Sequence, residues 1–78
     1  MIEVRWFSTL IKRTRSQLPR TTVTWREGIC PRAIFKDEGC DDVDADHVIA
    51  VVNGEQVDMN SLLKDGDDVE FLVGITGG

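Results

Sequence analysis

The chain has 78 residues, of which 41% are hydrophobic and 29% are charged, and its formal net charge at pH 7 is -5. This length fits one domain with a small core, and the composition favours a folded, soluble protein over a disordered one. No apolar run approaches the roughly 20 residues that a membrane-spanning helix needs, and the N-terminal residues lack a signal-peptide pattern, so we expect a cytoplasmic protein that does not bind membranes.

Opposite charges are concentrated in the two halves of the chain. Residues 1–36 hold eight Lys or Arg and two acids (8 - 2 = +6), whereas residues 37–78 hold one Lys and twelve acids (1 - 12 = -11). Either the folded protein has two faces of opposite sign, which would steer charged partners, or the halves intermingle and neutralise each other. The acidic total and the lack of a stacking motif argue against nucleic acid as a partner. The basic residues between 12 and 20 therefore predict a solvated loop or a contact with an acidic partner.

Two strands are predicted near the N-terminus. Apolar and polar residues alternate over 2–7, which predicts a strand with one buried face and with Phe7 over the other face. Residues 21–25 are β-branched or aromatic, which predicts a second strand, antiparallel to the first. In this pair we expect Trp6 and Trp25 to contact each other.

One helix is predicted between residues 30 and 39. Pro31 suits the first helical turn, and Gly39 suits the position just past the last one. At about ten residues the helix depends on packing, with Ile34 and Phe35 facing a sheet. Residues 8–15 could form an extended loop or a short helical turn.

Three more strands follow an acidic connector. Residues 48–52 are a continuous apolar run, as expected of a central strand, and Asn53-Gly54 predicts a tight turn into a short return strand. Residues 60–64 could form one helical turn, and the turn at 65–67 starts a last strand over 68–73. The order β-β-α-β-β-β predicts an α+β roll of the ubiquitin-like β-grasp type. We expect one domain over residues 1–78, with a mixed four- to five-stranded sheet covered on one face by a single short helix.

The last strand leads into residues 74–78, which we expect to form a flexible tail ending in Gly77-Gly78. Alternation places Phe71 towards the core and Leu72 on the open face, where Leu72 is either exposed beside Ile75 or packed under a loop of its own chain. Two terminal glycines cost ordering entropy and contribute no packing. They indicate either a frayed end or a reactive terminal carboxylate whose bare backbone enters a partner enzyme's slot.

Three segments, residues 51–55, 62–72 and 76–78, together resemble the sulfur-carrier family of β-grasp proteins. This MoaD/ThiS-like family includes the small subunit of molybdopterin synthase and the thiamine-biosynthesis sulfur carrier. The shared pattern is a strand ending in Asn-Gly, a Leu-x-x-Gly-Asp turn, a last strand and a terminal Gly-Gly. Residues 4–10 resemble the opening strand of the molybdopterin type, whereas the short helix is closer to the thiamine type. The Pro-Pro that often precedes the molybdopterin-type tail is replaced by Val73-Gly74.

The resemblance implies a carrier that acts as a co-substrate and not as an enzyme, or as the small non-catalytic subunit of a synthase. An E1-like adenylyltransferase would use ATP to activate the Gly78 carboxylate, and a sulfurtransferase or cysteine desulfurase would supply sulfur for a thiocarboxylate. A sulfur-accepting synthase would then use that sulfur for molybdopterin, tungstopterin or thiamine. The carrier itself would bind no cofactor. The residues expected to contact partners are Phe7, Leu72, Gly74, Ile75, Thr76 and Gly77.

Two other functions remain open from the sequence. The same activated Gly78 carboxylate could form isopeptide bonds with lysines, which would make the protein a ubiquitin-like modifier. Alternatively, the chain could be a plain interaction domain with an inert tail.

Other candidate sites are weaker. Residues 42–46 alternate Asp like a calcium loop, but His47 stands where that loop requires glycine, so we expect a solvated connector and no metal. His47 is the only histidine and is more typical of a structural residue. Cys30 and Cys40 are too far apart for a CxxC redox motif or a zinc half-site, so we expect free thiols, with a disulfide as the less favoured alternative.

Overall fold

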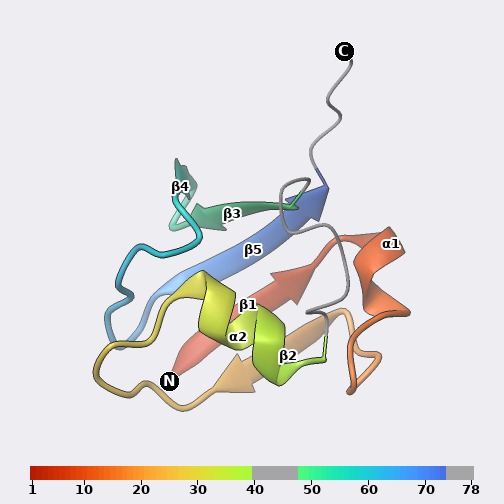
Figure 1. Cartoon of the computed structure of the whole chain (residues 1–78), viewed down its shortest axis with the longest axis horizontal. Helices are drawn as coiled ribbons and strands as arrows, with labels where there is room; N and C mark the ends of the chain where they lie inside the picture. Colours follow the sequence, from red (N-terminus) through yellow and green to blue (C-terminus); the bar gives the residue numbers. More distant parts are fainter. Residues whose placement is uncertain (40–47, 74–78) are drawn as a thin grey trace.

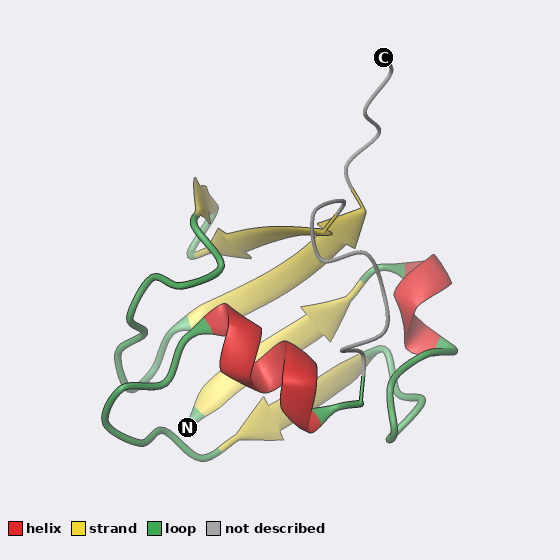
Figure 2. Ribbon diagram, viewed as in Figure 1, coloured by secondary structure: helices red, strands yellow, loops and turns green. Residues whose placement is uncertain are grey.

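The computed structural model describes residues 1–39 and 48–73, which form a five-stranded mixed sheet with two helices (Figure 1). The elements are β1 (Ile2–Trp6), α1 (Ser8–Ile11), β2 (Arg20–Val23), α2 (Pro31–Asp37), β3 (Val48–Val52), β4 (Glu55–Val57) and β5 (Asp68–Val73). The strand order is β2-β1-β5-β3-β4, in which β1 and β5 are parallel and all other neighbours are antiparallel. Helix α2 covers one face of this sheet (Figure 2), so the predicted β-grasp fold is confirmed. In these two ranges no helix has the length and apolar character needed to cross a membrane.

Helix α2 begins and ends where the sequence predicts. Pro31 occupies the first turn, and Gly39, just past the end, has a φ of +80°, a conformation that costs glycine little. The buried residues of the helix, Pro31, Ile34 and Phe35, all face the sheet. With seven residues the helix is too short to be stable alone, and this apolar stripe holds it in place.

The core between α2 and the sheet is organised around an aromatic cluster. The Trp6 ring stacks on Phe71 with centroids 4.6 Å apart, and Phe35 lies 6.3 Å from Trp6 and 5.9 Å from Phe71. Stacked and tilted aromatic pairs at these distances stabilise a core beyond their burial alone. The buried apolar residues of this core are Ile2, Val4, Trp6, Leu10, Ile29, Ile34, Phe35, Val48, Ala50, Leu63, Val69 and Phe71.

The predicted contact between Trp6 and Trp25 is wrong. The β1–β2 register pairs Ile2 with Val23, so Trp25 lies beyond the end of β2 that is farthest from Trp6. Trp25 is instead half-exposed, and its indole N–H donates a hydrogen bond of 2.8 Å to the Leu63 carbonyl.

Two segments that could have been helical differ in outcome. Residues 8–11 form the single turn α1, with Leu10 buried beneath it. The turn expected over 60–64 is wrong, because the chain turns earlier: the Ser61 N–H donates to the Asp58 carbonyl at 3.0 Å. Leu63 is then drawn into the core, where its N–H donates to the Ile29 carbonyl at 2.9 Å.

Asn53 links the β3–β4 turn to the start of β5. Its side-chain amide donates to the Asp67 carboxylate at 3.0 Å, and its side-chain oxygen accepts from the Asp68 N–H at 3.0 Å. The backbone N–H of Asn53 also donates to the Asp68 carbonyl at 2.8 Å, and its φ is +53°. Asn tolerates this left-handed conformation better than most residues, so Asn53 serves both the turn and the strand junction.

We expect Asn53→Gly to lower the free energy of unfolding by about 1–2 kcal/mol, because it keeps the left-handed backbone but removes both side-chain hydrogen bonds. Asn53→Ala should cost about 1 kcal/mol more, since a Cβ disfavours positive φ. Urea denaturation measures both values. As a control, Asn60→Ala removes an exposed side-chain bond to Arg32 and should cost less than Asn53→Gly. Equal stability of Asn53→Gly and the unmodified protein would contradict this assignment.

Candidate functional site

The tail that carries the predicted chemistry lies outside the described residues. Residues 74–78 include Gly78 and the expected contact residues Gly74, Ile75, Thr76 and Gly77, so the geometry does not test their roles. The described residues that lead to them are the end of β5 and the surface around it. This surface contains the two remaining predicted contact residues, Phe7 and Leu72.

Leu72 lies on the open face of the sheet, as predicted. Its neighbours Val69 and Phe71 are buried against α2, and the alternation of the strand directs Leu72 to the other side. There it stands opposite Ile49 of β3 in an antiparallel pair. Leu72 is half-buried, and because directly opposed side chains contact each other, Ile49 accounts for part of that burial.

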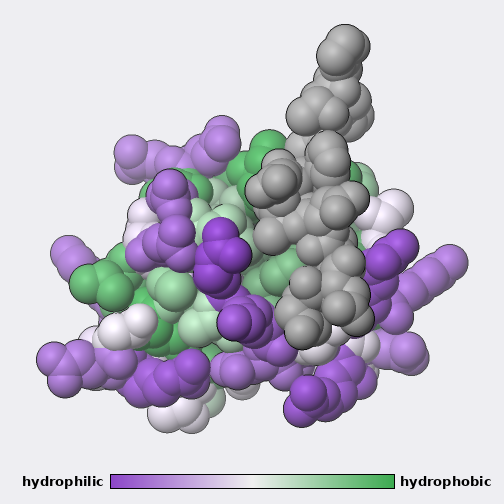
Figure 3. Space-filling model, viewed as in Figure 1, coloured by the Kyte–Doolittle hydropathy of each residue, from purple (hydrophilic) through white to green (hydrophobic). Residues whose placement is uncertain are grey.

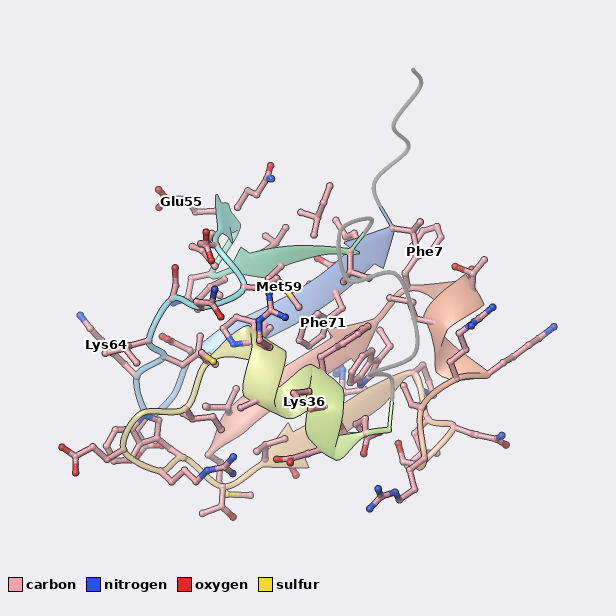
Figure 4. The ribbon with its side chains drawn as sticks, viewed as in Figure 1. Phe7, Lys36, Glu55, Met59, Lys64 and Phe71 are labelled. Atoms are coloured by element: carbon pink, nitrogen blue, oxygen red, sulfur yellow. The ribbon has the colours of Figure 1, made fainter. Side chains whose placement is uncertain are left out.

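Phe7 stands beside Leu72 at the end of β1. Trp6 is paired with Phe71, so the next residue, Phe7, lies level with Leu72, and the Phe7 N–H donates to the Phe71 carbonyl at 2.9 Å. Figure 4 places Phe7 beside the end of β5 and Phe71 beneath α2. We call Phe7, Ile49 and Leu72 the open-face apolar patch.

The backbone of Phe7 is held from two sides. Its carbonyl accepts hydrogen bonds from the N–H groups of Leu10 at 2.8 Å and Ile11 at 3.2 Å, which anchors it to the first turn of α1. Leu10 is buried, so α1 is attached to the core. The Phe7 side chain nevertheless remains 41% exposed. An exposed aromatic side chain on a fixed backbone can enter a partner's pocket at a low cost in entropy.

Ion pairs join neighbouring strands across the open face, and those of Arg5 link the two oppositely charged halves of the chain. Arg5 lies 3.3 Å from Asp68 and 3.7 Å from Glu70, and Arg20 lies 3.4 Å from Glu3. All five side chains are at least a third exposed, so each pair contributes at most about 1 kcal/mol. The charged halves thus neutralise each other where β1 meets β5.

Away from this junction the charges stay separate. The basic segment 12–20 follows α1 and leads into β2 at one edge of the sheet. At the other edge Glu55 is the first residue of β4, and Asp58 follows its last residue. In Figure 3 hydrophilic side chains surround most of the α2-bearing face. Each of the two arrangements expected from the sequence is therefore correct for part of the sheet.

No group of three or more His, Cys, Asp or Glu that could hold a metal ion occurs in residues 1–39 and 48–73. The acidic residues 42–46, His47 and Cys40 lie outside the described residues. Cys30 is a free thiol, half-buried at the residue that precedes α2.

The comparison with protein families decides the relationship. A model described as the ThiS family matches residues 10–78. The chain belongs to the ThiS family. This confirms the resemblance to MoaD/ThiS-like carriers, and the match covers the β-grasp domain from residue 10 onwards together with the tail. A search of curated proteins finds no match.

Solved structures with the same fold cover nearly the whole chain. SAMP1 from Haloferax volcanii superposes with a TM-score of 0.73 at 16% identity, over 99% of this chain and 98% of that one. A putative molybdopterin converting factor, subunit 1, from Pyrococcus furiosus gives 0.72 at 22% identity, over 95% and 97%. The complex of subunits 1 and 2 of the molybdopterin-converting factor from Helicobacter pylori 26695 gives 0.65 at 23% identity, over 99% and 97%. At these identities the likeness shows the fold.

One residue of the patch, Ile49, was not identified from the sequence. The apolar run 48–52 does carry a signal, because a strand that is apolar on both faces puts hydrophobic side chains on the open face too. The sequence does not show that β3 pairs with β5, so it does not predict that Ile49 lies opposite Leu72.

We expect Phe7→Ala and Leu72→Ala each to lower the free energy of unfolding by less than about 1.5 kcal/mol, because both side chains already contact solvent. Phe71→Ala should cost about 3–5 kcal/mol, since it leaves a cavity beside Trp6. Chemical denaturation of the three variants measures this difference. A Leu72→Ala cost similar to that of Phe71→Ala would show that Leu72 belongs to the core.

Proposed function

We propose that this protein is a sulfur carrier whose Gly78 carboxylate is adenylated and then converted to a thiocarboxylate. The thiocarboxylate donates its sulfur in the biosynthesis of a molybdopterin-type or tungstopterin cofactor or of thiamine. The observation that carries this proposal is the ThiS-family match, which extends through the Gly77-Gly78 end.

The chemistry requires activation because a carboxylate is a poor electrophile. A carboxylate oxygen of Gly78 attacks the α-phosphorus of ATP on an E1-like adenylyltransferase, and pyrophosphate leaves. The terminal sulfur of a persulfide, supplied by a sulfurtransferase or cysteine desulfurase, attacks the acyl adenylate and displaces AMP. A thiol then cleaves the resulting sulfur–sulfur bond, which leaves the thiocarboxylate and a disulfide. In these steps the carrier supplies the carboxylate, and its partners supply the catalytic groups.

The tail length places a limit on where a partner can dock. Five residues follow Val73, and an extended chain spans at most about 3.5 Å per residue, or roughly 17 Å in total. A partner's active site must therefore lie within that distance of the end of β5. The open-face apolar patch is at this end, so it is the natural surface for such a partner to bind.

One related structure supports docking by a second protein. The Helicobacter pylori protein is described as a protein–protein complex of subunits 1 and 2 of the molybdopterin-converting factor. The chain aligned with this one covers almost its whole length. By analogy, the sulfur-accepting partner of the present carrier would bind the patch and receive the tail.

Adding one alanine after Gly78 should abolish activation. The terminal carboxylate then lies one residue farther from β5, and the residue that bears it has a Cβ. Intact-mass spectrometry after incubation with the cognate activating enzyme, ATP and a sulfur donor provides the measurement. The unmodified protein should show an AMP adduct and then the exchange of oxygen for sulfur. Neither change in the unmodified protein, or equal change in the extended one, would refute the proposal.

Phe7→Ala and Leu72→Asp should each slow adenylation about tenfold or more while the protein stays folded, because they remove or charge the patch. Leu62→Asp is the matched control, since Leu62 is 74% exposed but lies outside the patch. Initial rates of pyrophosphate release measure the effect. Equal loss in all three variants would argue against a role of the patch.

A protein modifier differs from this proposal in its final acceptor. If a lysine amine displaced AMP, the product would be an isopeptide bond between Gly78 and another protein. Expression of a tagged carrier in cells would then yield many high-mass conjugates that disappear when Gly78 is deleted. If no such conjugates form and a thiocarboxylate is detected, only the sulfur-carrier function remains.

A further inference from the structure

One edge of the sheet, strand β2, presents unpaired backbone groups. Among the described residues, β2 pairs only with β1, and it is the lowest strand in Figure 2. The Trp6 N–H donates to the Pro19 carbonyl at 3.0 Å, and hydrogen-bonded pairs alternate along an antiparallel ladder. The backbone groups of Pro19, Thr21 and Val23 are therefore the ones that face β1. The N–H and C=O groups of Arg20 and Thr22 point away from β1.

No other residue of the described chain occupies these groups. Among residues 1–39 and 48–73 no hydrogen bond reaches the outward amides or carbonyls of Arg20 and Thr22, and both side chains are exposed. Exposed strand edges of this kind are templates for the addition of an extended segment. The opposite edge, β4, has only three residues, of which Glu55 is the first, and Asp58 follows the last.

The charge around β2 selects the kind of segment. Residues 12–26 hold five Lys or Arg and no acid. Arg20, at the edge itself, pairs with Glu3 of β1 at 3.4 Å, and its side chain remains 64% exposed. Arg26 pairs with Asp37 at 3.4 Å, and both side chains are exposed. Pairing of two copies of this chain through β2 would bring like charges together, which is unfavourable. An acidic segment would instead find complementary charge.

We propose that the free edge of β2 binds an acidic segment of a partner protein, in extended conformation, as a sixth strand of the sheet. The added segment would form backbone hydrogen bonds with Arg20 and Thr22, and its acidic side chains would lie near Arg20 and the basic segment before it. β1 separates this edge from β5 and β3, so the partner leaves Leu72 and Ile49 accessible. This binding does not depend on the chemistry of Gly78.

The test uses a fluorescent peptide that begins with the four residues Val-Thr-Val-Thr and ends with three aspartates. Fluorescence anisotropy with the full chain should show saturable binding. The same peptide with every valine and threonine N-methylated should bind at least about tenfold more weakly, because it lacks the donors that an added strand needs on either edge. A peptide with lysines in place of the aspartates should also bind more weakly. Equal binding of the N-methylated peptide would overturn the proposal.

Two pairs of measurements on the protein localise the binding. By NMR, the amides of Arg20 and Thr22 should exchange with solvent more slowly when the peptide is bound, whereas those of Thr21 and Val23 are protected already. Unchanged exchange at Arg20 and Thr22 under saturating peptide would refute edge addition. Arg20→Gln should weaken binding about three- to fivefold, and the control Lys64→Gln, which lies beyond the opposite end of β2 from Arg20, should not.

Thr22→Pro removes an outward N–H without breaking the β1–β2 ladder, and should weaken peptide binding at least about tenfold. Its rate of adenylation by the activating enzyme should equal that of the unmodified protein. If Thr22→Pro does not fold, the N-methylated peptide carries the same test. Loss of adenylation in a folded Thr22→Pro variant would show that the edge belongs to the tail-processing surface, contrary to the proposal.

Discussion

The parallel pairing of β1 with β5 is the interaction on which the rest of the structure depends. It joins the first strand of the chain to the last described one, and its buried side is closed by the Trp6 ring stacked on Phe71. Two parallel strands cannot be connected by a tight turn, so the chain between them must cross over the sheet. That crossing segment contains α2, which covers the core, and the strands that complete both sides of the sheet.

The same pairing also builds the surface from which the tail is proposed to act. With Trp6 opposite Phe71, the following residues Phe7 and Leu72 come level with each other on the open face, and Ile49 of β3 completes the patch. Alternation along β5 separates the two roles, because Phe71 anchors the strand while Leu72 faces outward. The tail therefore starts from a fixed point at the end of β5. Its length limits how far from the patch the Gly78 carboxylate can reach in a bound partner.

The distribution of charge divides the surface into areas with different uses. The ion pairs of Arg5 with Asp68 and Glu70 neutralise the middle of the sheet. All three side chains are at least a third exposed, so these pairs do not dominate stability. Positive charge remains at the β2 edge and negative charge at the β4 edge. The docking proposed near the tail and the acidic docking proposed at β2 thus centre on different strands of the sheet.

Local features of the sequence determined most of the elements and the family. Alternation predicts β1 and β5, and Pro31 and Gly39 mark the two ends of α2. Turns with glycine and asparagine separate the remaining strands. Each of these signals acts over only a few residues. The tertiary structure decided what depends on register between distant segments. Trp6 packs on Phe71 and not on Trp25, Leu63 is buried against Ile29 in place of a helical turn, and Ile49 joins Leu72. No local pattern specifies these contacts, since each follows from which strands become neighbours after the chain has crossed the sheet.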